Sequence, residues 1–251
     1  MTAKVDILVI GGGITGAGIA LEAARRGASV LLVEQKDFAW GTSSRSSKLV
    51  HGGLRYLREG AIALTRESVL ERRQLLRDAP GLVEPQRFLI GHYEGRSPGK
   101  AMMRLGLAIY DLLGGERHRH ALDTAGYAKL APHTASNGLQ GGSGYLDAKT
   151  DDARLVWRVL QEAQSHGAQL RNYTRVDSLL LEAGRVQGAR LRDEAGDISE
   201  VHASCVISAT GVKPNIGFLE HSGVRCLVGV LTDEHLQTNV SGIYAAGDCA
   251  E

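Results

Sequence analysis

The stretch that decides the fold is VDILVIGGGITGAGIALEAARRG, residues 5–27. Its first six residues are mostly apolar, which is typical of a strand buried inside a parallel sheet. Residues 11–16 then follow the pattern Gly-x-Gly-x-x-Gly. From Ile14 to Arg26 small and apolar residues recur at helical spacing, until Gly27 ends the run. Strand, glycine turn and helix in this order predict a dinucleotide-binding βαβ unit.

The turn has a separate physical role for each of its spaced glycines. Gly11 allows the tight turn, Gly13 lets the backbone approach a pyrophosphate, and Gly16 lets helix and strand pack closely. Ile14 and Thr15 open the helix, whose unpaired N–H groups and positive dipole end favour phosphates. We therefore expect a dinucleotide to bind here; the alternative is a glycine turn with a structural role alone.

A second apolar strand, SVLLV at residues 29–33, ends at Glu34 and Gln35. A carboxylate at such a strand end accepts hydrogen bonds from the ribose hydroxyls of the dinucleotide. Glu34 also repels a 2′-phosphate, which disfavours NADP. We expect Glu34 and Gln35 to belong to the cofactor site.

Two later strand ends favour FAD over NAD. CVISA, residues 205–209, leads into Ala209-Thr210-Gly211, and IYAA, residues 243–246, leads into Gly247-Asp248. Flavoproteins with a two-part FAD domain use such a strand end to present an Asp to the ribityl chain. We expect Ala209, Gly211, Gly247 and Asp248 at the cofactor; the alternative is two ordinary strand-to-loop turns.

Composition is that of a globular α/β chain. The 251 residues are 43% hydrophobic and 23% charged, and the formal net charge of +1 gives no reason to expect nucleic acid as a partner. We expect one FAD-binding domain over residues 1–251, with an insertion at about 82–144. The three cysteines have no metal or redox spacing, and no signal peptide or apolar run of membrane-spanning length is recognised, so we expect a cytoplasmic chain.

The coarse pattern of helices and strands completes the fold prediction. Helical spacing covers residues 62–77 and 152–166, and Asp151 and Asp152 are expected to cap the second of these helices. Turns within residues 168–201 predict an antiparallel β-meander, whereas the glycine-rich residues 137–144 are expected to form a loop. The prediction is a Rossmann-like α/β domain with a central parallel sheet and a meander.

Residues 5 to about 211 resemble the FAD-dependent glycerol-3-phosphate dehydrogenase family. Beyond residues 9–27, the matching segments are GTSSRSSKLVHGGLRYL (41–57), YLDAKTDDARLV (145–156) and NYTRV (172–176). The resemblance implies that the flavin and its phosphates lie along Thr42, Ser43, Ser44, Ser47 and Leu49. It also implies that Val176 contacts the adenine through its backbone. The alternative for the Ser/Thr-rich segment is a solvated surface loop.

The same resemblance places Arg55 and Tyr56 over the flavin, facing a small-molecule substrate such as glycerol 3-phosphate. Arg55 can hold a phosphate with two parallel hydrogen bonds; the alternative is a surface cation. His51 titrates near neutral pH and can accept a proton from the substrate alcohol. A loop histidine hydrogen-bonded to backbone is the alternative. The implied chemistry is hydride transfer from a secondary alcohol carbon to the flavin.

The end of the sequence departs from this family pattern. Residues 209–251 resemble the end of the FAD domain of NADH-dependent flavoprotein reductases, and the segment expected to cover the substrate is not found there. One alternative is therefore a minimal or truncated FAD-binding domain with little turnover. Another is an NADH-dependent flavin reductase, which is disfavoured because the glycine cluster at 138–144 follows no apolar strand and opens no helix.

Residues 102–113, MMRLGLAIYDLL, predict an amphipathic helix. Related dehydrogenases act at the membrane surface, so such a helix could lie in the interface, with the chain peripheral at the inner membrane face. We favour a helix packed within the protein, because the segment lacks a cluster of lysines and arginines.

Overall fold

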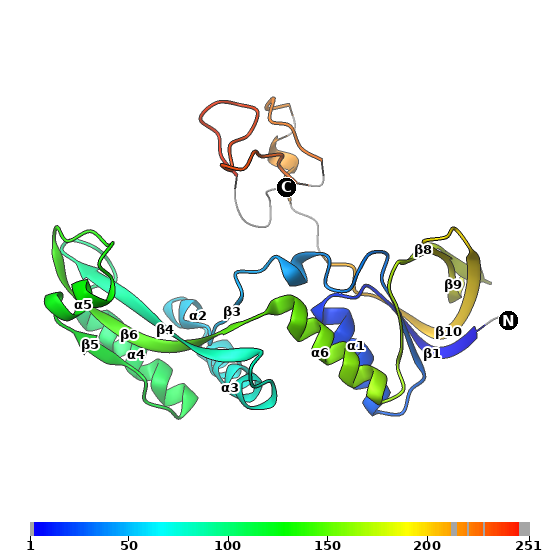
Figure 1. Cartoon of the computed structure of the whole chain (residues 1–251), viewed down its shortest axis with the longest axis horizontal. Helices are drawn as coiled ribbons and strands as arrows, with labels where there is room; N and C mark the ends of the chain where they lie inside the picture. Colours follow the sequence, from blue (N-terminus) through cyan, green and yellow to red (C-terminus); the bar gives the residue numbers. More distant parts are fainter. Residues whose placement is uncertain (1–2, 212–214, 220, 228, 246–251) are drawn as a thin grey trace. The chain divides into compact units, whose positions relative to one another are not determined.

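The structure is a computed structural model that describes residues 3–211, 215–219, 221–227 and 229–245. The chain forms two compact units, the first made of residues 1–44 and 156–251 and the second of residues 45–155 (Figure 1). The insertion expected at about 82–144 falls inside the second unit.

The first unit is built on a six-stranded sheet with strand order β7-β2-β1-β10-β9-β8. Its strands are β1 (Ala3–Ile10), β2 (Val30–Val33), β7 (Gln169–Arg171), β8 (Thr174–Glu182), β9 (Arg185–Asp193) and β10 (Ile198–Ser208). Strand β1 pairs in parallel with β2 and β10, and β2 pairs in parallel with β7. Strands β8, β9 and β10 form an antiparallel meander. The predicted Rossmann-like parallel sheet with a meander is confirmed.

Helices α1 (Ile14–Arg25) and α6 (Asp152–Ser165) supply the helical part of this unit. In α6 the buried apolar side chains are Val156, Leu160 and Ala163, whose spacing of four and three residues puts them on one face. The sheet buries its own apolar cluster, with Leu8, Leu31 and Leu191 almost fully covered. Two short 3₁₀ turns, Thr42–Ser44 and Gly217–Leu219, complete the unit.

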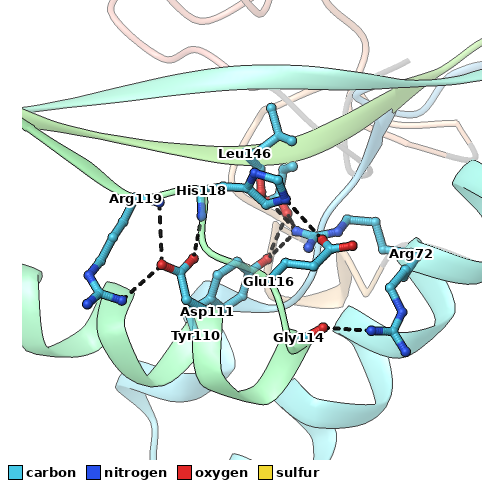
Figure 2. Close-up of polar contacts among 10 residues, drawn as sticks. Arg72, Tyr110, Asp111, Gly114, Glu116, His118, Arg119 and Leu146 are labelled. Carbon is cyan, nitrogen blue, oxygen red and sulfur yellow. Dashed lines mark hydrogen bonds and ion pairs between the residues drawn. The ribbon is translucent and has the colours of Figure 1, made fainter.

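The second unit is an antiparallel sheet with helices. Strand β6 (Leu139–Thr150) lies between β3 (Leu49–Val50) and β4 (Val83–Tyr93), and also pairs with β5 (His120–Leu122). The helices are α2 (Leu54–Arg58), α3 (Ile62–Asp78), α4 (Lys100–Gly114) and α5 (Thr124–Leu130). Helices α3 and α4 pack on one face of this sheet (Figure 2).

The loop predicted at residues 137–144 is wrong, because most of that segment belongs to β6. Its glycines make room for aromatic rings that lie on the strand. A Cβ at Gly142 would sit 2.2 Å from Cδ2 of Tyr127, and one at Gly144 would sit 2.1 Å from Cε1 of His120. The glycines therefore serve packing within a sheet and mark no turn.

Two expectations for the later strands also change. Residues 205–208 are the end of the long strand β10, which begins at Ile198, and the Cys205 side chain is exposed. Of the strand expected at residues 243–246, the described part forms a single antiparallel bridge between Tyr244 and Gln237. Gly247 and Asp248 lie outside the described residues. Among the described residues, no helix combines the length and the apolar character needed to cross a bilayer.

Candidate functional site

A cleft of about 590 Å³ opens in the first unit where β1, β2 and β10 reach their carboxyl ends. In open parallel sheets this is the edge at which ligands bind. The residues predicted for the cofactor that line the cleft are Gly11, Gly13, Ile14, Thr15, Glu34, Gln35, Thr42, Ser43, Val176, Ala209 and Gly211. Segments far apart in the sequence thus meet at one site.

The three spaced glycines have different surroundings. Gly11 has φ +112°, and a Cβ there would lie 2.4 Å from the carbonyl oxygen of Ala209. A Cβ at Gly16 would lie 1.9 Å from the carbonyl oxygen of Gly11. Gly16 does not line the cleft, so its role is close packing of helix on strand.

Gly13 is the glycine that faces the cleft. Its nearest neighbour is Oγ of Ser43, 3.0 Å from a Cβ built there, with nothing else closer than 3.8 Å. Gly13 is the N-cap of α1, and the N–H of Ile14 donates a hydrogen bond to the same Ser43 oxygen at 3.0 Å. The helix N-terminus and a hydroxyl therefore meet at the position expected for a pyrophosphate.

Glu34 is held by the backbone around it. Its Oε2 accepts a hydrogen bond from the N–H of Gly12 at 2.8 Å, and its Oε1 accepts one from the N–H of Lys36 at 3.0 Å. A Cβ at Gly12 would lie 2.9 Å from Cβ of Glu34, so this second glycine of the triplet is also needed. Sequence reasoning gave Gly12 no role. Each carboxylate oxygen keeps a further lone pair for a ribose hydroxyl.

Some residues that line the cleft were not predicted from the sequence to contact the cofactor. Trp40 is 53% exposed, and the Lys36 Nζ lies 6.0 Å from its ring centre. Ile10, Val33, Gly41, Thr174, Arg175 and Thr210 complete this group. In the sequence, a tryptophan directly before the small residues 41–44 could have indicated that this loop belongs to the site. Ser44, by contrast, is not among the lining residues; its hydroxyl lies against the backbone oxygens of Gly41 and Trp40.

The second unit holds the remaining predicted residues. Ser47 lies before β3 and Leu49 lies within it, and both are exposed. Gly53, at φ +79°, turns the chain into α2. The His51 ring lies edge-on to Tyr56, with centroids 5.8 Å apart, and the Arg55 guanidinium carbon lies 5.6 Å from the Tyr56 ring centre. The structure thus brings together the three residues predicted to face the substrate.

A buried polar network anchors the backbone next to His51. Oδ1 of Asp147 accepts hydrogen bonds from the N–H of Gly52 at 3.0 Å and from the Tyr110 hydroxyl at 2.7 Å, and it pairs with Arg72. Arg72 also donates to the carbonyl oxygen of Leu146 at 3.0 Å (Figure 2). Burial, and then the charge of Asp147, raises the pKa of Tyr110 above its ordinary value, so the phenol stays a donor.

A second carboxylate fixes the segment before β3. Asp152 accepts hydrogen bonds from the N–H and the hydroxyl of Ser46, at 3.1 and 2.7 Å, and from the Lys48 Nζ at 2.5 Å. Asp151 caps α6 as predicted, because its Oδ1 accepts the N–H of Arg154 at 3.1 Å. Asp152 accepts the N–H of Ala153, but its main partners are Ser46 and Lys48.

Comparison with known proteins shows which family this chain is similar to. A family model described as FAD dependent oxidoreductase matches residues 6–238. The aerobic glycerol-3-phosphate dehydrogenase of Staphylococcus haemolyticus is 40% identical over 211 residues, covering 82% of this chain and 38% of the relative. The glycerol-3-phosphate dehydrogenase of Mycobacterium leprae is 44% identical over 216 residues, covering 84% and 37%. The chain thus spans well under half the length of these relatives.

Solved structures give the same picture. The glycerol-3-phosphate dehydrogenase of Bacillus halodurans, solved in complex with FAD, superposes with a TM-score of 0.64 at 33% identity, over 83% of this chain and 34% of that one. L-proline dehydrogenase of P. horikoshii superposes with a TM-score of 0.62 at 22% identity, over 84% and 54%. The second likeness concerns the fold alone.

Proposed function

This chain belongs to the FAD-dependent oxidoreductase family, and we propose that it binds FAD in the cleft of the first unit and oxidises a secondary alcohol, with glycerol 3-phosphate as the substrate. The observation that carries the cofactor assignment is the opening at Gly13. There a side chain would meet little protein, whereas at Gly11 and Gly16 it would meet backbone oxygens. The N-terminus of helix α1 therefore has space beside it for the pyrophosphate of a dinucleotide.

The residues of the cleft fit FAD along its length. The pyrophosphate would lie at Gly13, Ile14 and Thr15, and a ribose at Glu34, whose two oxygens are already oriented by backbone N–H groups. The strand ends at Val176 and Ala209 line the same cleft. FAD, when bound, supplies the hydride acceptor, and the protein supplies orientation and proton chemistry.

For the alcohol substrate we assign roles to the residues on and beside α2. The guanidinium of Arg55 binds the substrate phosphate with paired hydrogen bonds. The His51 imidazole takes the hydroxyl proton while the carbon-bound hydrogen leaves as hydride, so the alcohol becomes a ketone. Tyr56 lies beside both and fixes their relative positions. This assignment is supported by the resemblance of residues 41–57 to the dehydrogenase relatives.

A second candidate function is FAD binding with little turnover. It is favoured by one observation: the residues that line the cleft of the first unit do not include His51, Arg55 or Tyr56. An NADH-dependent reductase has less support, because the glycine cluster at 138–144 lies largely in β6 and opens no helix in the described part of the chain.

For location we propose a cytoplasmic chain whose partner is a small-molecule substrate, without membrane association. Helix α4 exposes Met102 and Leu112, but its only basic residues are Lys100 and Arg104, too few for strong attraction to anionic lipid. Co-sedimentation with anionic vesicles should show little binding, and strong salt-sensitive binding would contradict this.

The test is anaerobic stopped-flow bleaching of the bound flavin by glycerol 3-phosphate, with NADH as the comparison donor. Acid release first identifies the cofactor; recovery of NAD would remove the proposal. Arg55→Ala should abolish saturable bleaching, whereas Arg58→Ala, in the same helix, should retain it. FAD without any bleaching by glycerol 3-phosphate would favour the second candidate. Bleaching by NADH alone would favour the reductase.

A further inference from the structure

A second cleft, of about 410 Å³, lies within the second unit between α4 and β5. Arg104 and Ala108 share one face of α4, four residues apart, and form one wall. Arg117 and Arg119, two residues apart in the segment leading into β5, form the other. Three guanidinium groups from two elements therefore border one space, and no carboxylate is among the residues that line it.

Two of these three guanidinium groups have no partner among the described residues. Arg119 pairs with Asp111 at 3.0 Å, which offsets its charge (Figure 2). Within the part of the chain that the structure describes, neither the Arg104 nor the Arg117 side chain has an ion pair or hydrogen bond. The cleft thus carries a surplus of two positive charges.

The floor of the cleft is polar and buried. Ser143 on β6 is 2% exposed, and its hydroxyl lies 2.8 Å from Nε2 of His92. Burial, and then the charge of Lys100, lowers the pKa of His92, so this histidine is neutral and adds no charge of its own. The three arginines, by contrast, stay charged at every physiological pH.

We propose that this cleft binds the phosphate group of a small organic phosphate. Guanidinium groups match phosphate oxygens with paired hydrogen bonds, and a phosphate monoester carries close to two negative charges at neutral pH. The cleft is larger than a bare phosphate needs and is also lined by Leu105, Leu107 and Ala121. A short carbon skeleton fills that apolar part. All residues that line this cleft belong to the second unit, and none of them lines the cleft at Gly13.

The test is isothermal titration of the FAD-saturated full chain with phenyl phosphate at low ionic strength. Saturating FAD prevents the probe from binding at Gly13. Apart from any binding at Arg55, which the Arg55→Ala variant removes, we expect one saturable site, at least tenfold weaker in the Arg104→Gln/Arg117→Gln double variant. The control is Arg66→Gln/Arg87→Gln, which removes the same charge from exposed positions outside the cleft and should stay within twofold of wild type.

The outcomes separate the possible sources of the phosphate. Weaker binding of inorganic phosphate than of phenyl phosphate supports the organic part of the proposal, and equal binding overturns that part. Vesicles with phosphatidic acid that bind through Arg104 and Arg117, when phenyl phosphate does not saturate, would make a lipid headgroup the source. Equal weakening by both double variants, or no arginine-dependent binding to either probe, would overturn the proposal. Failure of flavin reduction would leave the result unaffected, and if FAD does not bind, the dependence on Arg104 and Arg117 still distinguishes this site from the cleft at Gly13.

Discussion

The backbone N–H of Gly52 donates a hydrogen bond to Oδ1 of Asp147 at 3.0 Å, although the two residues lie 95 positions apart in the sequence. This contact joins the two most distinctive segments of the sequence, residues 41–57 and 145–156. The same segments meet again where β3 pairs with β6, at Leu49 with Lys149. The backbone that carries His51 is therefore fixed by tertiary contacts, as the proton-acceptor role proposed for His51 requires.

The space at Gly52 gives the first prediction. A Cβ at Gly52 would lie 2.1 Å from the Tyr110 hydroxyl oxygen, so Gly52→Ala should lower the free energy of unfolding by about 1–3 kcal/mol. Gly106→Ala, in α4 with nothing within 4 Å, should instead raise it by about 0.5–1 kcal/mol. Urea unfolding followed by circular dichroism measures both. Tyr110→Phe removes the obstructing oxygen and should recover part of the loss in the double variant; no recovery would contradict this account.

The ion pair of Asp147 with Arg72 gives the second prediction. Both side chains are 5% exposed, so Asp147→Asn leaves a buried guanidinium without its counter-charge and should cost about 3–5 kcal/mol in unfolding free energy. Glu84→Gln removes the exposed pair with Lys149, in which both side chains are 53% exposed, and should cost less than about 1 kcal/mol. Similar losses in the two variants would show that the buried pair is not needed for stability.

The sequence predicted those features that depend on residues close together in the chain. The strand, glycine turn and helix of residues 5–27 follow from hydrophobic spacing and backbone freedom within one short segment, and all were confirmed. Strand β6 was missed because Gly142 and Gly144 are required by the rings of Tyr127 and His120, which come from other elements. Strand β4 was missed for a related reason, since its partner was the unrecognised β6. The role of Asp147 likewise depends on its contacts with Gly52, Arg72 and Tyr110, which are distant in the sequence.

The glycine turn gives the third prediction, which separates cofactor contact from folding. Gly13→Val should abolish FAD binding with little loss of helix content, because its side chain points into the cleft near Ser43. Gly16→Ala should mainly lower the free energy of unfolding, because its Cβ would lie 1.9 Å from a backbone oxygen. Gly18→Val, on the same helix with nothing within 4 Å, is the matched control and should bind FAD normally. Flavin absorbance after gel filtration reports binding; normal FAD content in Gly13→Val would show that the turn is structural only.

Acid stability gives the last prediction, through Asp152. Burial opposes ionisation of its carboxyl group, but the hydrogen bonds from Lys48 and Ser46 prevail and lower its pKa from 3.8 to about 2. A group whose pKa is lowered by folding contributes stability above its unfolded pKa and loses that stability as the pH falls through its folded pKa. The shift corresponds to about 2 kcal/mol, present at neutral pH and lost between about pH 4 and pH 2.

Asp152→Asn should therefore be less stable than wild type at pH 7 by about 2 kcal/mol, and the difference should shrink towards pH 2. Asp151→Asn removes the neighbouring carboxylate while keeping an acceptor at the cap of α6, and serves as the control. Urea unfolding at a series of pH values measures the difference for each variant. A difference for Asp152→Asn that stays constant from pH 7 to pH 2 would mean that its contacts with Ser46 and Lys48 do not depend on the charge of the carboxylate.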